Sequence, residues 1–189
     1  GEDAETSERH FAEAVRAGLR QVGAMSCEEA VSLMHEATVK GRNLAWKLRQ
    51  QVGVGRDLAY RFDRLKSRKE TQPVRPGRVQ LLVDRAESTP AQVALGRATA
   101  LANGHDLARD LGNLPGNICT PSYLAEAARK LATQFKLKVQ VLDRKQMEAL
   151  KMGSLLSVAR GSDEPPKLIV LQYAGGPAKQ APVALIGKG

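Results

Sequence analysis

Apolar positions at the start of the chain recur mainly at helical spacing. Ser7 is suited to cap a helix whose apolar side chains recur over residues 11–22. Farther along, Ser26 and Glu29 resemble a helix-capping box. The apolar run over 30–34, however, is also short enough to be a buried strand. Periodicity does not decide between helix and strand here, and both alternatives stay open.

The middle of the chain predicts two long helices separated by a strand. The first helix is expected over 41–65, and the strand over 78–84. The second helix is expected over 90–111, where Ala and Leu are abundant, with Ser88 or Thr89 as its cap. A helix of this length could join two domains.

Helix signals in the second half are local and specific. Thr120 can serve as N-cap and Pro121 as the first helical residue of one helix. Asp143 can cap a second, short helix, for which Gly153 is the expected stop.

Strand signals alternate with these helices. Strands are expected over 137–141, 167–173 and 182–186, and the last is apolar enough to be buried on both faces. Alternation of strands and helices predicts an α/β fold with a largely parallel sheet. In such sheets, sites form beyond the carboxyl ends of the strands.

Composition is that of a globular protein with an uneven charge. Of the 189 residues, 42% are hydrophobic and 26% charged, which argues against wholesale disorder. The start of the chain has neither the basic end nor the apolar core of a signal peptide, no apolar run is long enough to span a membrane, and a cytoplasmic location is expected.

The net charge of +9 is concentrated in residues 40–85, where thirteen basic residues face four acidic ones. Such a cluster could bind nucleic-acid phosphates, and the alternative is a solvated helix face followed by an exposed basic loop over 66–77. Only 4% of residues are aromatic, too few for a single-strand stacking platform. The basic residues of interest are Lys40, Arg42, Lys47, Arg49, Arg56, Arg61, Arg64, Lys66, Arg68, Lys69, Arg75 and Arg78.

Several kinds of catalytic motif are missing from the sequence. It contains no HExxH, no GxSxG, no Walker A motif and no GxGxxG after a strand. Cys27 and Cys119 form no CxxC pair and are expected to be buried, reduced thiols. The three histidines are each expected on the surface or in a helix: His10, His35 and His105. Lys188 lies between two glycines after an apolar run, where the backbone can approach a ligand closely and the amine could meet a phosphate, a carboxylate or a metal. The alternative is a lysine at a strand end whose charged group simply reaches solvent.

Five stretches together resemble the cytosol (leucyl) aminopeptidase family, in its bacterial type. The strongest are the Asn-x-Pro-x-Asn turn within 108–125 and the Gly-Lys-Gly strand end within 181–189. One departure is Gly116, where many relatives have a second proline. The remaining stretches are 39–50, 58–67 and 150–173.

The resemblance implies an internal fragment with three parts. Residues 1–87 would be the C-terminal part of an N-terminal α/β domain, and 88–114 a long interdomain helix. Residues 115–189 would be the truncated start of a mixed-sheet α/β metallopeptidase catalytic domain.

The resemblance also implies a function and a ligand. The parent protein would release N-terminal amino acids, preferably Leu, from peptides by two-metal hydrolysis with Zn²⁺ or Mn²⁺, and a bicarbonate would act as base. Lys188 would be a metal ligand through its side-chain nitrogen. No catalytic residue and no further ligand fall within this sequence, so the segment alone is expected to be inactive.

The family resemblance also implies partners. The parent would form a homo-hexamer in the cytoplasm and bind peptide substrates. Some bacterial relatives bind DNA, so a DNA-binding accessory role for the basic 40–85 segment is the alternative function.

Overall fold

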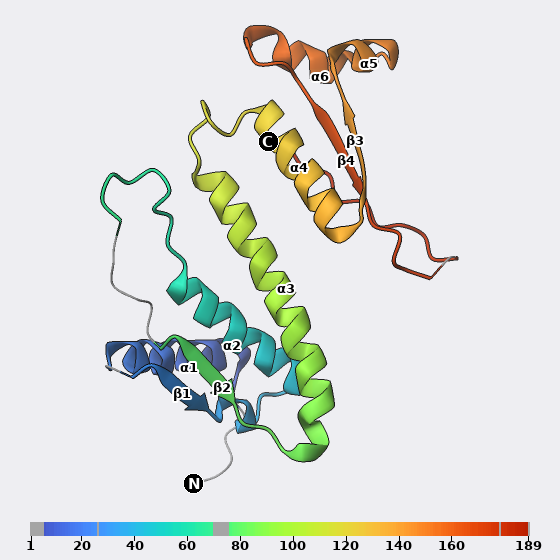
Figure 1. Cartoon of the computed structure of the whole chain (residues 1–189). Coiled ribbons are helices and arrows are strands. Elements are labelled where there is room, and N and C mark those ends of the chain that lie inside the picture. The colour runs from blue at the N-terminus through green and yellow to red at the C-terminus, as the bar shows by residue number, and fades with distance from the viewer. Residues whose placement is uncertain (1–5, 26, 70–75, 178, 189) are drawn as a thin grey trace. The chain divides into compact units, whose positions relative to one another are not determined.

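The computed structural model describes residues 6–25, 27–69, 76–177 and 179–188. The chain divides into two compact units, Gly1–Asn113 and Leu114–Gly189 (Figure 1). Helices and small sheets alternate in both, which confirms the α/β class. Among the described residues, no helix is both long and apolar enough to cross a membrane.

The first unit packs three helices with a two-stranded parallel sheet. Strands β1 and β2 pair in register, with Glu29 opposite Arg78 and Ser32 opposite Leu81. The elements in chain order are α1 (Glu8–Ala24), β1 (Glu29–Ser32), the 3₁₀ turn η1 (Met34–Glu36), α2 (Leu44–Ala59), β2 (Arg78–Leu81), the 3₁₀ turn η2 (Arg85–Glu87) and α3 (Ser88–Asn113).

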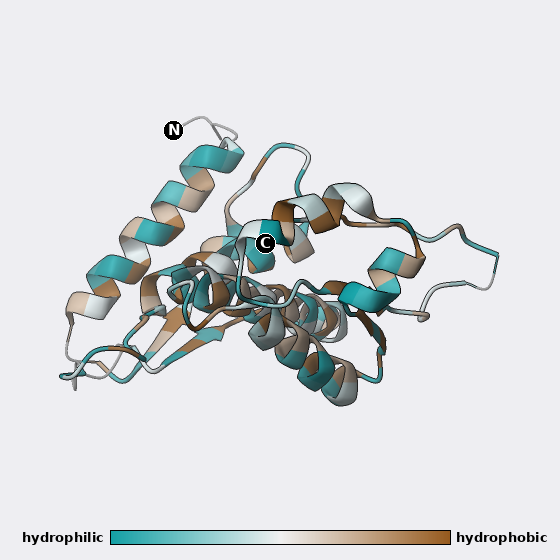
Figure 2. Ribbon diagram, turned by 90° about the horizontal axis from the view of Figure 1, so that it is seen from above, coloured by the Kyte–Doolittle hydropathy of each residue, from teal (hydrophilic) through white to brown (hydrophobic). Residues whose placement is uncertain are grey.

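Helix α1 begins at the predicted cap and supplies the main core. The backbone N–H of His10 donates to the Ser7 hydroxyl oxygen at 3.2 Å. Phe11 and Val15 are 1% exposed, and the Phe11 ring lies 5.6 Å from that of Trp46 on α2. Figure 2 shows hydrophobic residues alternating with hydrophilic ones along α1, the helix that follows the N-terminus.

The ambiguous 30–34 run forms a strand followed by a 3₁₀ turn. Strand β1 gains a backbone partner in β2, and this pairing decides between the two alternatives. The Ser32 hydroxyl donates to the Gln51 side-chain oxygen at 2.7 Å, which ties β1 to α2. Ser26, the first residue of the possible capping box, lies outside the described residues.

Helix α2 is shorter than the predicted 41–65, because local signals limit it. Gly41 has a φ of +65°, and the Asn43 side chain accepts from the Trp46 N–H at 3.0 Å as N-cap. Helix α3 is slightly longer than expected and begins at Ser88, so the prediction of Ser88 or Thr89 as its cap is wrong, because both residues lie within the helix. A second core cluster joins the two helices, in which Leu48 is buried against Ala91 and Ala94.

The second unit packs helices against a two-stranded sheet. Strands β3 and β4 are antiparallel, with Lys138 opposite Gln172, so the prediction of a largely parallel sheet is wrong here. Helices α5 and α6, which lie between the two strands in the sequence, are both at one end of the β3–β4 sheet, so β4 runs back along β3 (Figure 1). The elements are α4 (Pro121–Phe135), β3 (Lys138–Leu142), α5 (Arg144–Ala149), α6 (Gly153–Val158), the 3₁₀ turn η3 (Ala159–Gly161) and β4 (Leu168–Gln172).

Two predicted helix starts in this unit are confirmed. The Thr120 hydroxyl oxygen accepts from the Tyr123 N–H at 3.3 Å, and Asp143 forms a capping box with Gln146. The predicted stop at Gly153 is wrong. Helix α5 ends earlier, where Lys151 adopts a φ of 57°, and Gly153 begins α6.

The predicted buried strand over 182–186 is also wrong. These residues are irregular, and Leu185 and Ile186 are 95% and 98% exposed. Among the described residues, β3 and β4 pair only with each other, so the run lacks a strand partner. Apolar character alone therefore does not produce a strand here.

Candidate functional site

Lys188, the predicted metal ligand, lies in the second unit. It is exposed and belongs to the irregular segment 181–188. Its apolar neighbours Leu185 and Ile186 are exposed as well. The amine therefore has an open approach for a ligand.

The described residues do not make a metal centre by themselves. No group of three or more His, Cys, Asp or Glu side chains among them could hold an ion. A protein zinc site uses at least three side-chain ligands, and Lys188 offers one. These residues therefore do not fit a complete metal centre, and no reaction step follows from them alone.

The other candidate donors are dispersed. His10 lies in α1 and His105 in α3, as expected, whereas His35 is 4% exposed in η1. The predicted burial of the cysteines is only partly correct, because both free thiols, Cys27 and Cys119, are half-buried. The three histidines and Cys27 belong to the first unit, whereas Cys119 belongs to the second unit, as Lys188 does.

Three of the thirteen basic residues in the 40–85 segment form ion pairs with acidic residues of the first unit. Arg42 donates to Glu8 at 2.7 Å, Arg56 to Asp106 at 3.0 Å, and Arg78 lies 3.0 Å from Glu29. Each ion pair neutralises a guanidinium that a nucleic acid would need. Arg75 lies outside the described residues. These pairings weaken the DNA-binding interpretation.

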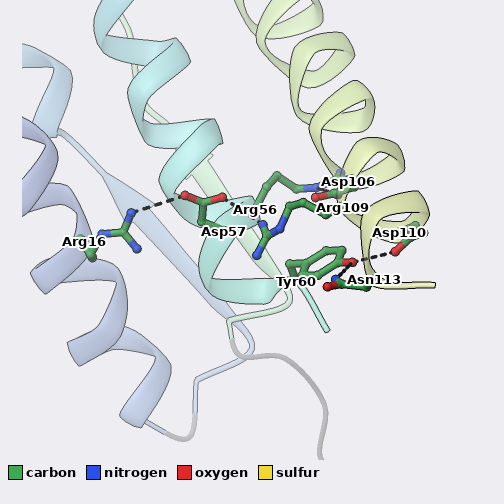
Figure 3. A network of polar contacts seen from close by, with 8 residues as sticks. All are labelled: Arg16, Arg56, Asp57, Tyr60, Asp106, Arg109, Asp110 and Asn113. Atoms are coloured by element: carbon green, nitrogen blue, oxygen red, sulfur yellow. Dashed lines mark hydrogen bonds and ion pairs between the residues drawn. The ribbon is translucent and has the colours of Figure 1, made fainter. Parts of the chain in front are cut away.

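A polar network joins the three helices of the first unit (Figure 3). Asp57 on α2 accepts from Arg16 on α1 at 3.4 Å and from Arg109 on α3 at 3.1 Å. Arg56, the preceding residue, donates both to Asp106 and to Asn103 on α3. Arg56 and Asp57, which are adjacent on α2, thus make these contacts with the neighbouring helices α1 and α3.

Tyr60 continues the network at the end of α2. Its hydroxyl donates to Asp110 at 2.9 Å and accepts from Asn113 at 3.1 Å, while the Arg109 guanidinium lies 3.8 Å from the ring centroid (Figure 3). Partial burial raises the pKa of the Tyr60 phenol above 10.0, and the Asp110 carboxylate raises it further, against opposing effects of Asn113 and Arg109.

The network holds the helices together and offers no reactive group. Every carboxylate in it is paired, and Tyr60 stays protonated at neutral pH, so no base or nucleophile is presented. This polar network was not predicted from the sequence. A signal was available in Asp106, Asp110 and Asn113, which recur at helical spacing on one face of the 88–113 helix.

Two family models match this chain in order. The N-terminal domain of the cytosol aminopeptidase family matches residues 1–69, and its catalytic domain matches 106–189. The second match includes Lys188.

Curated relatives match across the whole chain. A probable cytosol aminopeptidase of Herminiimonas arsenicoxydans is 50% identical over 189 residues, which is 100% of this chain and 38% of the relative. A protein of the same description in Ralstonia pickettii is 49% identical, again over 100% of this chain and 38% of the relative. The chain therefore spans well under half the length of these relatives.

A solved structure shares the fold. The bottromycin maturation enzyme BotP in complex with Mn is 28% identical to this chain, with a TM-score of 0.69, over 87% of this chain and 33% of BotP. Fold and sequence thus agree with the two domain matches, and the chain belongs to the cytosol aminopeptidase family.

Proposed function

We propose that this chain is part of an aminopeptidase that releases N-terminal amino acids from peptides. The observation that carries the proposal is the ordered match of both family domains to one chain, together with 50% identity along its whole length. The proposal concerns a protein of the relatives' length, because this chain spans 38% of them.

Lys188 is proposed as a metal ligand of that protein. It falls within the stretch matched by the catalytic domain, and its exposure leaves the amine open to join ligands from elsewhere. A lysine amine ligates only after it has lost its proton, so binding would release one. A bound divalent ion would polarise a peptide carbonyl and activate water.

Further features of the longer protein are proposed from the family resemblance. We propose two Zn²⁺ or Mn²⁺ ions, a bicarbonate base, a preference for Leu and a cytoplasmic homo-hexamer. The solved structure of BotP in complex with Mn supports a metal of this kind. We also propose the division into 1–87, the interdomain helix 88–114, and 115–189. The order of the two matches, an N-terminal domain at 1–69 and a catalytic domain at 106–189, supports the order of these parts.

The test compares two lysine variants in a protein of the relatives' length. Lys188→Ala should lose bound metal, measured by mass spectrometry of the elements, and hydrolysis of a leucine anilide, because a ligand is removed. Lys179→Ala, an exposed lysine of the same unit, should retain both. Unchanged metal content in the Lys188 variant overturns the ligand assignment.

Two further measurements separate the parts of the proposal. The longer wild-type protein should hydrolyse the anilide after Mn²⁺ is added, and no hydrolysis overturns the aminopeptidase assignment. The 189-residue chain alone should show none, since it supplies one ligand where a metal centre needs at least three.

A further inference from the structure

Helices α2 and α3 of the first unit border an open groove of about 730 Å³. Its apolar lining includes Trp46, Val93 and Leu101. Val93 and Leu101 are each 51% exposed, although they are large and apolar. A volume of this size is within the range of ligand pockets, about 300–1,000 Å³.

The charged side chains of the groove are all basic. Arg42, Arg49 and Arg97 line it, and no Asp or Glu does so among the described residues. Arg42 is already held by Glu8 and lies 5.3 Å from the Trp46 ring centroid. Arg49 and Arg97 are exposed and have no hydrogen-bond or ion-pair partner in the described part of the chain. Two unpaired guanidinium groups therefore flank an apolar surface.

The groove residues recur at helical spacing. Val93, Arg97 and Leu101 are four residues apart on α3, so they form one row along about 12 Å of that helix. Trp46 and Arg49 are three residues apart on α2 and face the same groove. The α3 wall thus presents exposed apolar side chains on both sides of a positive charge, and the α2 wall adds the positive charge of Arg49.

We propose that this groove binds an amphipathic helix of a partner protein that carries carboxylates beside aliphatic side chains. Aliphatic residues at intervals of three and four would pack on Val93 and Leu101, in the helix-in-groove mode. Carboxylates on the flanks would pair with Arg49 and Arg97, which gives the charge complementarity that guides such association.

A nucleic acid fits these observations less well. Its phosphates would pair with the arginines, but they would leave the exposed valine and leucine without contacts. Trp46, the aromatic residue of the groove, is 9% exposed and cannot offer a face for base stacking. The apolar half of the groove therefore favours a protein partner.

The test measures fluorescence anisotropy of a labelled probe with the full 189-residue chain. The probe is a capped peptide of about 15 residues, with Leu at intervals of three and four and Glu on both flanks. A matched peptide carries Lys in place of every Glu. The acidic peptide should bind and the basic peptide should not.

Groove variants then locate the binding. Arg49→Glu and Arg97→Glu should each weaken binding about fivefold, because an attraction becomes a repulsion. Val93→Ser should also weaken it, which tests the apolar contact without a charge change. Arg20→Glu, an exposed arginine of α1 outside the groove, is the matched control and should bind as the wild type does. Circular dichroism checks that each variant is folded.

Three outcomes would overturn the proposal. The first is no binding of the acidic peptide to the wild type. The second is that Arg49→Glu and Arg97→Glu bind no worse than Arg20→Glu. The third is that a short DNA duplex displaces the peptide and binds the groove more tightly, with the steep salt dependence of phosphate contacts, which would assign the surface to nucleic acid.

Discussion

The two units of this chain bury apolar side chains to different extents. In the first, Phe11, Val15 and Leu48 are 1% exposed, and a polar network ties its helices together. In the second, Met147 is 0% exposed, and the other buried apolar residues include three alanines and two leucines. Its large apolar side chains at Leu185 and Ile186 are almost fully exposed.

The difference lies in how far each unit covers its own large apolar side chains. Both units match domains of one family, yet the first completes a mixed aromatic and aliphatic core from its own residues. The second presents apolar residues that nothing in the described structure covers. Stability should therefore respond differently to substitutions in the two units.

The largest expected effect is at Phe11. Phe11→Ala should lower the free energy of unfolding of the first unit by about 3–5 kcal/mol, because it leaves a cavity beside Trp46. The counterpart Met147→Ala should destabilise the second unit by about 2–5 kcal/mol. Hydrogen exchange, read separately for each unit, measures both effects. Equal loss of protection in both units after either substitution would contradict the comparison.

A smaller effect concerns the pH dependence of the first unit. The folded-state pKa of Tyr60 is raised above 10.0, so its stabilising contribution is present below pH 10.0 and is lost as the pH rises through the raised value. Tyr60→Phe should remove this part of the alkaline decline. Urea unfolding gives the free energy of unfolding of the first unit at each pH. It can be followed by the fluorescence of Trp46, the single tryptophan of the sequence, which lies on α2.

Tyr173→Phe is the control for this titration, since Tyr173 is 80% exposed in the second unit. In the Tyr173→Phe variant, the free energy of unfolding of the first unit should depend on alkaline pH as it does in the wild type. If Tyr60→Phe also coincides with the wild type, the network does not couple this phenol to folding.

The smallest expected effect is at Leu185. Leu185→Ser should change the free energy of unfolding of the second unit by no more than about 0.5 kcal/mol, because the side chain is 95% exposed. Hydrogen exchange of β3 and β4 measures it. A destabilisation comparable to that of Met147→Ala would mean that Leu185 is buried in solution, and the contrast between the units would disappear.

Local signals in the sequence predicted the helices well. Ser7, Thr120 and Asp143 each cap a helix with the expected side-chain bond, because a cap depends only on residues two or three positions away. The end of α5 was missed, since Lys151 adopts a left-handed conformation that favours glycine and no local rule predicts it at this position.

Features that depend on distant residues were not predictable in the same way. The antiparallel direction of β4 depends on where the chain between the strands runs. The irregular 182–186 run depends on whether a partner strand is present. The Tyr60 network joins residues about fifty positions apart, and one sequence gives no indication of which charges meet. The role of Lys188 comes from the family resemblance and stays a prediction.

The Arg109 side chain has a consequence for how this family can diverge. It pairs with Asp57 and covers the Tyr60 ring at the same time, and Tyr60 in turn binds Asp110. Loss of the arginine in a lineage would remove one of the two ion pairs of Asp57 and uncover the Tyr60 ring, while the bonds from Arg16 to Asp57 and from Tyr60 to Asp110 would remain. Substitutions at Asp57 and Tyr60 should therefore accompany a substitution at Arg109 across descendants more often than a substitution at Asp110 does.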